Sequence, residues 1–67
     1  MHIVKENLKM YRKIKNITQQ EIADRIGVTR QCYAHYEQGV RQPSIDVLRN
    51  ICEVLECTSD EIIGIDN

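Results

Sequence analysis

The side chains best suited to chemistry in this chain of 67 residues lie in one stretch, GVTRQCYAHYEQG, at positions 27–39. In a helix, Gln31, His35 and Gln38 share one face, because they follow one another at steps of four and three residues. Arg30 flanks that face at its N-terminal end. The face offers hydrogen bonds and positive charge rather than an activated nucleophile, so we expect it to bind a ligand.

Five short helices are predicted around this stretch, and no strand, so the expected fold class is all-α. Apolar residues recur at steps of three and four, which is the helical period. The predicted helices cover about residues 3–15, 19–26, 29–38, 45–55 and 59–63.

Their ends carry capping signals. Thr18 with Glu21 and Thr58 with Glu61 have the spacing of a capping box. The other expected N-caps are Thr29 and Ser44, and the expected C-terminal stops are Asn16, Gly27, Gly39 and Gly64. About two residues separate Gly27 from the next helix, so the second and third helices must cross steeply, as in a helix-turn-helix.

The hydrophobic core should take one face of each helix. Tyr33 and Tyr36 are expected to point inward from the third helix. The core stripe predicted for the fourth helix consists of Ile45, Leu48, Ile51, Cys52 and Leu55.

Length and composition limit the class of protein. The chain is expected to form one domain over residues 1–67, with no membrane span, no signal peptide and a cytoplasmic location. Its three cysteines lack CxxC spacing and are interpreted as apolar thiols, so no metal site is expected. We find no catalytic constellation, and predict neither an enzyme nor a cofactor.

Charge is unevenly distributed although the net charge is only −1. Residues 1–41 hold eight basic and four acidic side chains, whereas residues 42–67 hold one basic and six acidic ones. A polarised domain of this kind can turn a basic face toward phosphates.

Taken together, the motifs resemble the Cro/lambda-repressor-like helix-turn-helix family, also called the xenobiotic-response-element type. The segments that carry the resemblance are LKMYR, ITQQEIADRIGVTRQCYAHYEQG and QPSIDVLRNICEVLECTSDEII. It implies a five-helix DNA-binding domain with its motif at about residues 18–38 and its third helix in the major groove. The chain departs from the family pattern at Cys52, Glu56 and Cys57.

The resemblance also implies roles for individual residues. It assigns Arg30, Gln31 and His35 to the reading of bases, where arginine suits guanine and glutamine suits adenine. It implies an ion pair between Arg12 and Glu37. The residues assigned to DNA phosphates are Gln19, Thr29, Gln38 and Arg41.

The function that follows is a sequence-specific transcriptional regulator of double-stranded DNA, with repression expected and no small-molecule effector evident. The alternative is a protein-interaction module of the same fold, such as an antitoxin-like or antirepressor partner that does not read DNA. Acidic or apolar residues at positions 30 and 31 would favour that alternative, and the chain has Arg30 and Gln31 there.

A homodimer is expected, because one small domain reads only about half a site. The predicted interface is an exposed apolar cluster of Ile62, Ile63 and Ile65. Two alternatives stay open: Ile62 and Ile63 complete the core of the monomer, or the copies pair only on DNA.

Overall fold

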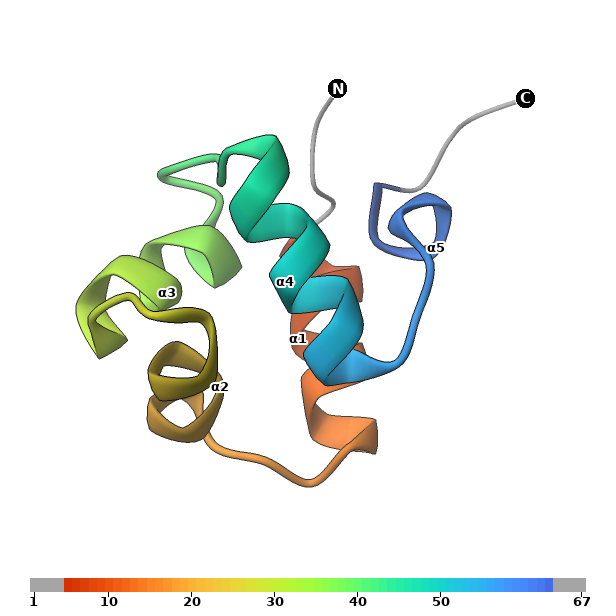
Figure 1. Ribbon diagram of the computed structural model, residues 1–67, viewed down its shortest axis with the longest axis horizontal. Coiled ribbons are helices and arrows are strands. Elements are labelled where there is room, and N and C mark those ends of the chain that lie inside the picture. The colour runs from red at the N-terminus through yellow and green to blue at the C-terminus, as the bar shows by residue number, and fades with distance from the viewer. Residues whose placement is uncertain (1–4, 64–67) are drawn as a thin grey trace.

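The computed structural model describes residues 5–63 and shows an all-helical domain (Figure 1). Its five helices are α1 (Lys5–Ile14), α2 (Gln19–Ile26), α3 (Arg30–Gln38), α4 (Ile45–Leu55) and α5 (Ser59–Ile63). This architecture confirms the predicted fold class. No helix in the described range is long and apolar enough to cross a membrane.

The helices begin at the predicted caps. Thr18 Oγ1 accepts a hydrogen bond from the N–H of Glu21 at 3.0 Å, and the Glu21 carboxylate accepts one from the N–H of Thr18 at 2.9 Å. The same reciprocal bonds join Thr58 and Glu61 ahead of α5. Single caps start α3 and α4, at Thr29 and Ser44 respectively.

Left-handed residues end the first four helices. Gly27 and Gly39 have φ values of 78° and 76°, and Asn16 has 58°. Glu56 ends α4 in the same conformation with a φ of 53°, so the departure from the family pattern at this position does not remove the turn. For a residue with a side chain, this conformation costs about 1–2 kcal/mol.

Packing brings α2 and α3 into direct contact. In Figure 1, α4 runs through the middle of the view, with α2 and α3 on one side and α5 on the other. α2 also packs on α4, while α1 contacts both α3 and α5. The helix that carries the polar face is therefore held from two directions, by α2 and by α1.

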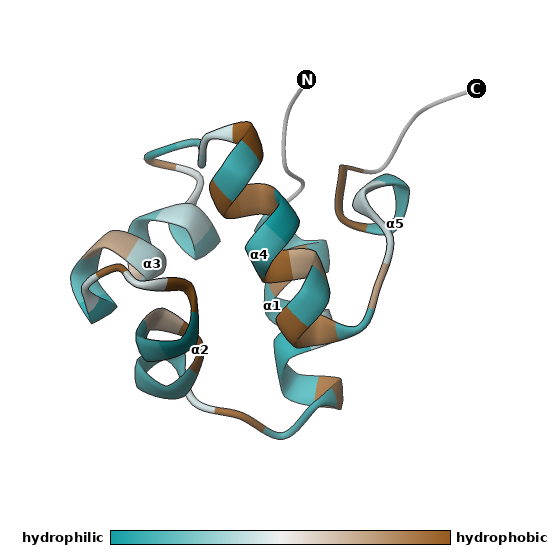
Figure 2. Ribbon diagram, in the orientation of Figure 1, coloured by the Kyte–Doolittle hydropathy of each residue, from teal (hydrophilic) through white to brown (hydrophobic). Residues whose placement is uncertain are grey.

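Ten apolar side chains form one core, and hydrophobic and hydrophilic segments alternate along α4 (Figure 2). Tyr33 and Tyr36 belong to this core, as predicted, with their rings edge to face at a centroid distance of 6.2 Å. The other buried members are Leu8, Ile22, Ala23, Ile26, Leu48, Ile51, Leu55 and Ile62.

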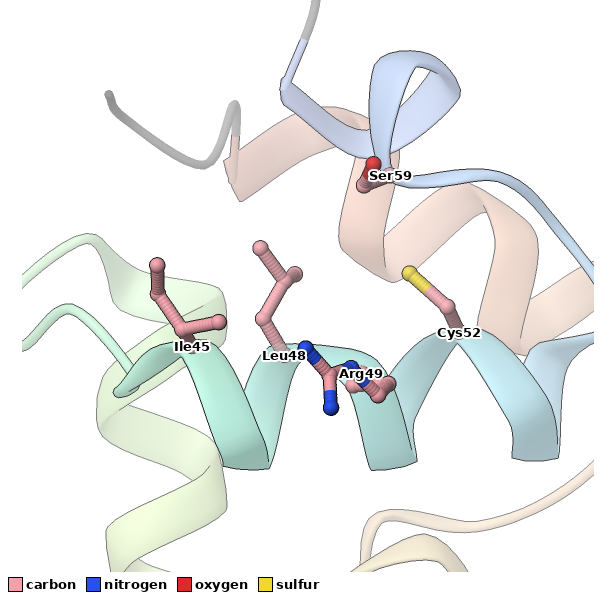
Figure 3. Close-up of a pocket in the computed structure, with 5 residues that line it drawn as sticks. All are labelled: Ile45, Leu48, Arg49, Cys52 and Ser59. Carbon is pink, nitrogen blue, oxygen red and sulfur yellow. The ribbon is translucent and has the colours of Figure 1, made fainter.

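The prediction of a core role for Ile45 is wrong, because its side chain is 61% exposed. Ile45 lies with Leu48 and Cys52 beside an open hollow of about 260 Å³ between α4 and α5 (Figure 3). Helical periodicity places Ile45 on the same side of α4 as Leu48, but at the first position of the helix its side chain is left mostly uncovered. Cys52 lies in the same hollow and is half-buried.

The predicted apolar interface also requires correction. Ile62 has no exposed surface and is part of the core of the monomer, since α5 packs this side chain inward against α1 and α4. Ile63 is half-buried. Ile65 lies outside the described residues, so Ile63 is the one described member of the predicted cluster with exposed surface.

Candidate nucleic-acid interface

The turn between α2 and α3 is short and strongly constrained. Gly27 takes the left-handed conformation, and its N–H and that of Val28 both bond to the carbonyl of Ala23. Thr29 then caps α3 by accepting a hydrogen bond from the N–H of Cys32 at 3.0 Å. These bonds fix the angle between the two helices and thereby aim the start of α3 outward.

The outer face of α3 is rich in available hydrogen-bonding groups. Arg30, Gln31 and Gln38 are exposed, and His35 is half-buried. None of these four side chains makes a hydrogen bond or an ion pair with another described residue. Since the hydrogen-bonding groups of these side chains are not used within the described chain, they are available to bind an external ligand.

The loop after α3 is held against the end of that helix by backbone hydrogen bonds. The N–H groups of Val40 and Arg41 both bond to the carbonyl of His35, at 3.0 and 3.3 Å. Arg41 is exposed and lies close enough to Tyr36 to act on that hydroxyl. Burial outweighs this cation and raises the pKa of Tyr36 to about 12.

At the start of α2, Gln19 and Gln20 share a surface hollow of about 470 Å³ with Arg30. The backbone N–H groups of Gln19 and Gln20 have no partner among the described residues. Such open N–H groups at a helix N-terminus favour an anion. Gln19, a predicted phosphate contact, and Arg30, a predicted base reader, therefore border the same depression.

Behind this surface, Arg12 and Glu37 form the ion pair that the resemblance implied. Arg12 Nε lies 2.5 Å from Glu37 Oε2, and Nη2 lies 3.2 Å from Oε1. The two side chains are only 12% and 4% exposed. The remaining donor, Nη1, binds the carbonyl of Ile17 at 2.8 Å and so holds the loop between α1 and α2.

Burial and hydrogen bonding have opposite effects on the pKa of the Glu37 carboxyl. Burial raises the pKa of its carboxyl, but hydrogen bonds from Arg12 and Gln19 outweigh burial, and the pKa lies below its usual value. The Tyr33 hydroxyl lies near the same pair without a hydrogen bond of normal geometry, and burial raises its pKa. Glu37 is therefore ionised and held by several donors.

Comparison with known families settles what this arrangement is. The family model described as helix-turn-helix matches residues 8–62, which is most of the chain.

The chain belongs to the helix-turn-helix family.

Two curated relatives and one solved structure illustrate the family membership. The chain is 45% identical over 58 residues to an uncharacterized HTH-type transcriptional regulator, YqaE of Bacillus subtilis, and covers 50% of that protein. It is 39% identical over 61 residues to the cryptic phage CTXphi transcriptional repressor RstR of Vibrio cholerae, of which it covers 54%. These matches use 87% and 91% of the chain, which spans about half the length of the curated relatives it matches.

The fold is shared with a transcriptional regulator from Listeria innocua known from a crystal structure. The TM-score is 0.86 at 24% identity, over 100% of this chain and 64% of the other. At this level of identity, the similarity concerns the fold.

Within this helix-turn-helix domain, the site residues predicted from sequence fall into two groups. The groups on α3 and in the following loop, namely Arg30, Gln31, His35, Gln38 and Arg41, lie on or next to one helix. Gln19 and Thr29 lie at the starts of α2 and α3. No three metal-ligating side chains among residues 5–63 come together as a candidate metal site.

Sequence reasoning missed one contact at this site. Gln19 Nε2 donates to Glu37 Oε1 at 3.0 Å, across 18 positions of the chain. No local sequence pattern predicts such a bond, because it forms only when α2 and α3 pack against each other.

Proposed function

We propose that this helix-turn-helix domain binds a specific site on double-stranded DNA and regulates transcription, acting as a repressor. The observation that carries the proposal is the exposed face of α3, whose arginine and glutamine side chains make no hydrogen bond within the described chain. The name of the relative RstR, a transcriptional repressor, supports the regulatory role.

Recognition of bases is assigned to the first turns of α3. With this helix in the major groove, Arg30 can donate two hydrogen bonds to guanine and Gln31 can pair with the edge of adenine. Each such pairing contributes about 1–3 kcal/mol of discrimination against a wrong base. His35 lies one turn after Gln31 on the same face and extends the reading surface.

Phosphate contacts are assigned to groups on both sides of this face. At the start of α2, the side-chain amide of Gln19 and the open backbone N–H groups face one DNA strand. The hydroxyl of Thr29 accepts the capping bond from Cys32 and still has its proton to donate. Gln38 and Arg41, at the end of α3 and beyond it, complete the set.

Two copies are proposed to read one palindromic site, with their α3 helices about 34 Å apart. Burial of Ile62 leaves little exposed apolar surface on the described part of α5, which favours pairing on DNA over a preformed dimer. Sedimentation with and without the selected duplex tests this, and a single copy bound to the complete selected site would contradict it. Because the relatives YqaE and RstR are bacterial proteins, DNA binding is proposed to take place in the cytoplasm.

The experiment that tests the function is selection of bound sequences from a random duplex pool. We expect one enriched motif, and an affinity for it that exceeds nonspecific binding by about 10³-fold or more. The affinity should fall steeply with salt, because phosphate contacts release counterions. A pool that shows no enrichment, at a salt concentration where binding is measurable, would overturn the proposal.

A further inference from the structure

Glu37 is a nearly buried acceptor that joins three helices. It lies on α3, but its carboxylate points away from the exposed face and toward α1 and α2. Three hydrogen bonds converge on its two oxygens, two from Arg12 and one from Gln19. An ion pair alone would account for only the first two.

The bond from Gln19 fixes the orientation of that side chain. A carboxylate can only accept hydrogen bonds, so the amide nitrogen of Gln19, and not its oxygen, must face Glu37. One N–H of the planar amide is thereby used, and the direction of the second N–H follows from it. Gln19 is the first residue of α2, so its side chain starts from the turn that carries the open backbone N–H groups.

We propose that Glu37 is a positioning residue for DNA binding: through Gln19 it orients the amide that donates to a phosphate at the start of α2. This inference rests on the proposed function. It differs from a purely structural role, because an apolar pair at positions 12 and 37 could hold α1 on α3 but would give Gln19 no acceptor.

The positioning role of Glu37 can be tested in variants that lack the ion pair between Arg12 and Glu37. Removing Arg12 alone would strand a buried carboxylate, whereas replacing both partners by uncharged residues leaves no unpaired charge. Two double variants form a matched set, R12M/E37L and R12M/E37Q. They have the same net charge as the wild type and differ from each other only in whether position 37 offers an acceptor to Gln19.

We expect R12M/E37L to bind the selected duplex about fivefold more weakly than R12M/E37Q, the size of one lost hydrogen bond between neutral groups. The loss should be equal for specific and nonspecific duplexes, and the salt dependence should not change. Adding Gln19→Ala should weaken R12M/E37Q by the same factor and leave R12M/E37L unchanged. Equal affinities of the two double variants, or an equal effect of Gln19→Ala in both, would overturn the proposal.

A second readout separates this inference from the function itself. In the free wild-type protein, the side-chain amide protons of Gln19 should exchange with solvent more slowly than those of Gln31, an exposed side chain without a hydrogen bond to another described residue, as measured by NMR. Exchange at the rate of a free amide overturns the inference, even where the double variants do not fold. If the wild type binds no duplex while Gln19 is protected, the proposed function fails and the positioning of Gln19 by Glu37 stands.

Discussion

Two regions of the domain, the α3 end and the α5 end, differ sharply in how far their polar contacts are exposed to water. Toward α3, α1 contributes Arg12, whose guanidinium meets Glu37 with side chains 12% and 4% exposed. Just after α1, the ammonium of Lys15 meets Glu56, the residue that ends α4, with side chains 33% and 73% exposed. Both are ion pairs between residues far apart in sequence, but only the first is withdrawn from water.

The attachment of α5 consists of exposed polar contacts placed over one buried side chain. Tyr11 donates to the Glu61 carboxylate at 2.9 Å, and Asn7 donates to the Glu61 carbonyl at 3.2 Å. Hydrogen bonds from Thr58 and Tyr11 lower the pKa of Glu61. Because water competes with these contacts, the stability of this end depends mainly on Ile62.

The two ends are therefore stabilised by different interactions. The α3 end depends on a polar network that is almost fully buried. Removing one charged member of this network leaves its partner charge buried and unpaired. The α5 end depends on apolar burial, with polar contacts that water can replace.

The largest expected effect comes from breaking the buried network from one side. Arg12→Met strands the Glu37 carboxylate and should lower the free energy of unfolding by about 3 kcal/mol. The double variant R12M/E37L should recover most of that loss. Urea denaturation of the wild type and both variants measures the difference, and equal midpoints for Arg12→Met and the wild type would contradict the account.

A smaller but still large effect is expected at the α5 end. Ile62→Ala should cost about 2–4 kcal/mol, because a fully buried side chain is truncated. The half-buried neighbour provides the control, and Ile63→Ala should cost less than half as much. Equal costs at both positions would mean that α5 does not pack Ile62 as described.

Acid should weaken the α3 end through Glu37. The pKa of this carboxyl is lower in the folded protein, so its contribution to stability is complete at neutral pH. That contribution begins to be lost below about pH 4.3, the usual pKa of glutamate, and disappears as pH falls through the folded value. Denaturation between pH 7 and pH 2 should show this loss in the wild type and a smaller loss in R12M/E37L. Parallel curves would exclude Glu37 as the group responsible.

The smallest effect is expected at the exposed ion pair. Lys15→Met should leave the urea midpoint nearly unchanged, and any difference from the wild type should vanish at 1 M salt, where exposed pairs are screened. A salt-independent loss comparable to that of Arg12→Met would contradict the contrast between the two ends.

Local features of this fold could be predicted from sequence because they depend on neighbouring residues. The capping residues Thr18, Thr29 and Ser44 and the left-handed glycines all satisfy backbone groups within a few positions of themselves. The inward direction of Tyr33 and Tyr36 follows from helical period in the same way.

The features that failed or were missed depend on how far neighbouring helices extend. Periodicity places Ile45 and Leu48 on one side of α4, but only tertiary packing decides that Leu48 is covered and Ile45 is not. Likewise, three isoleucines near the C-terminus suggest an exposed cluster, while α5 packs Ile62 into the core. The bond between Gln19 and Glu37 requires two docked helices and has no counterpart in the local sequence.

The most direct test of the central claim, that the outer face of α3 reads DNA while Arg41 only holds the backbone, is selection from a random duplex pool with two variants in parallel. Gln31→Ala should lose its preference at one base pair of each half-site and bind the best site more weakly by about 1–3 kcal/mol. Arg41→Ala should keep the wild-type motif, weaken binding to all duplexes alike and flatten the salt dependence. A Gln31→Ala protein that selects the wild-type motif with wild-type affinity would contradict the account.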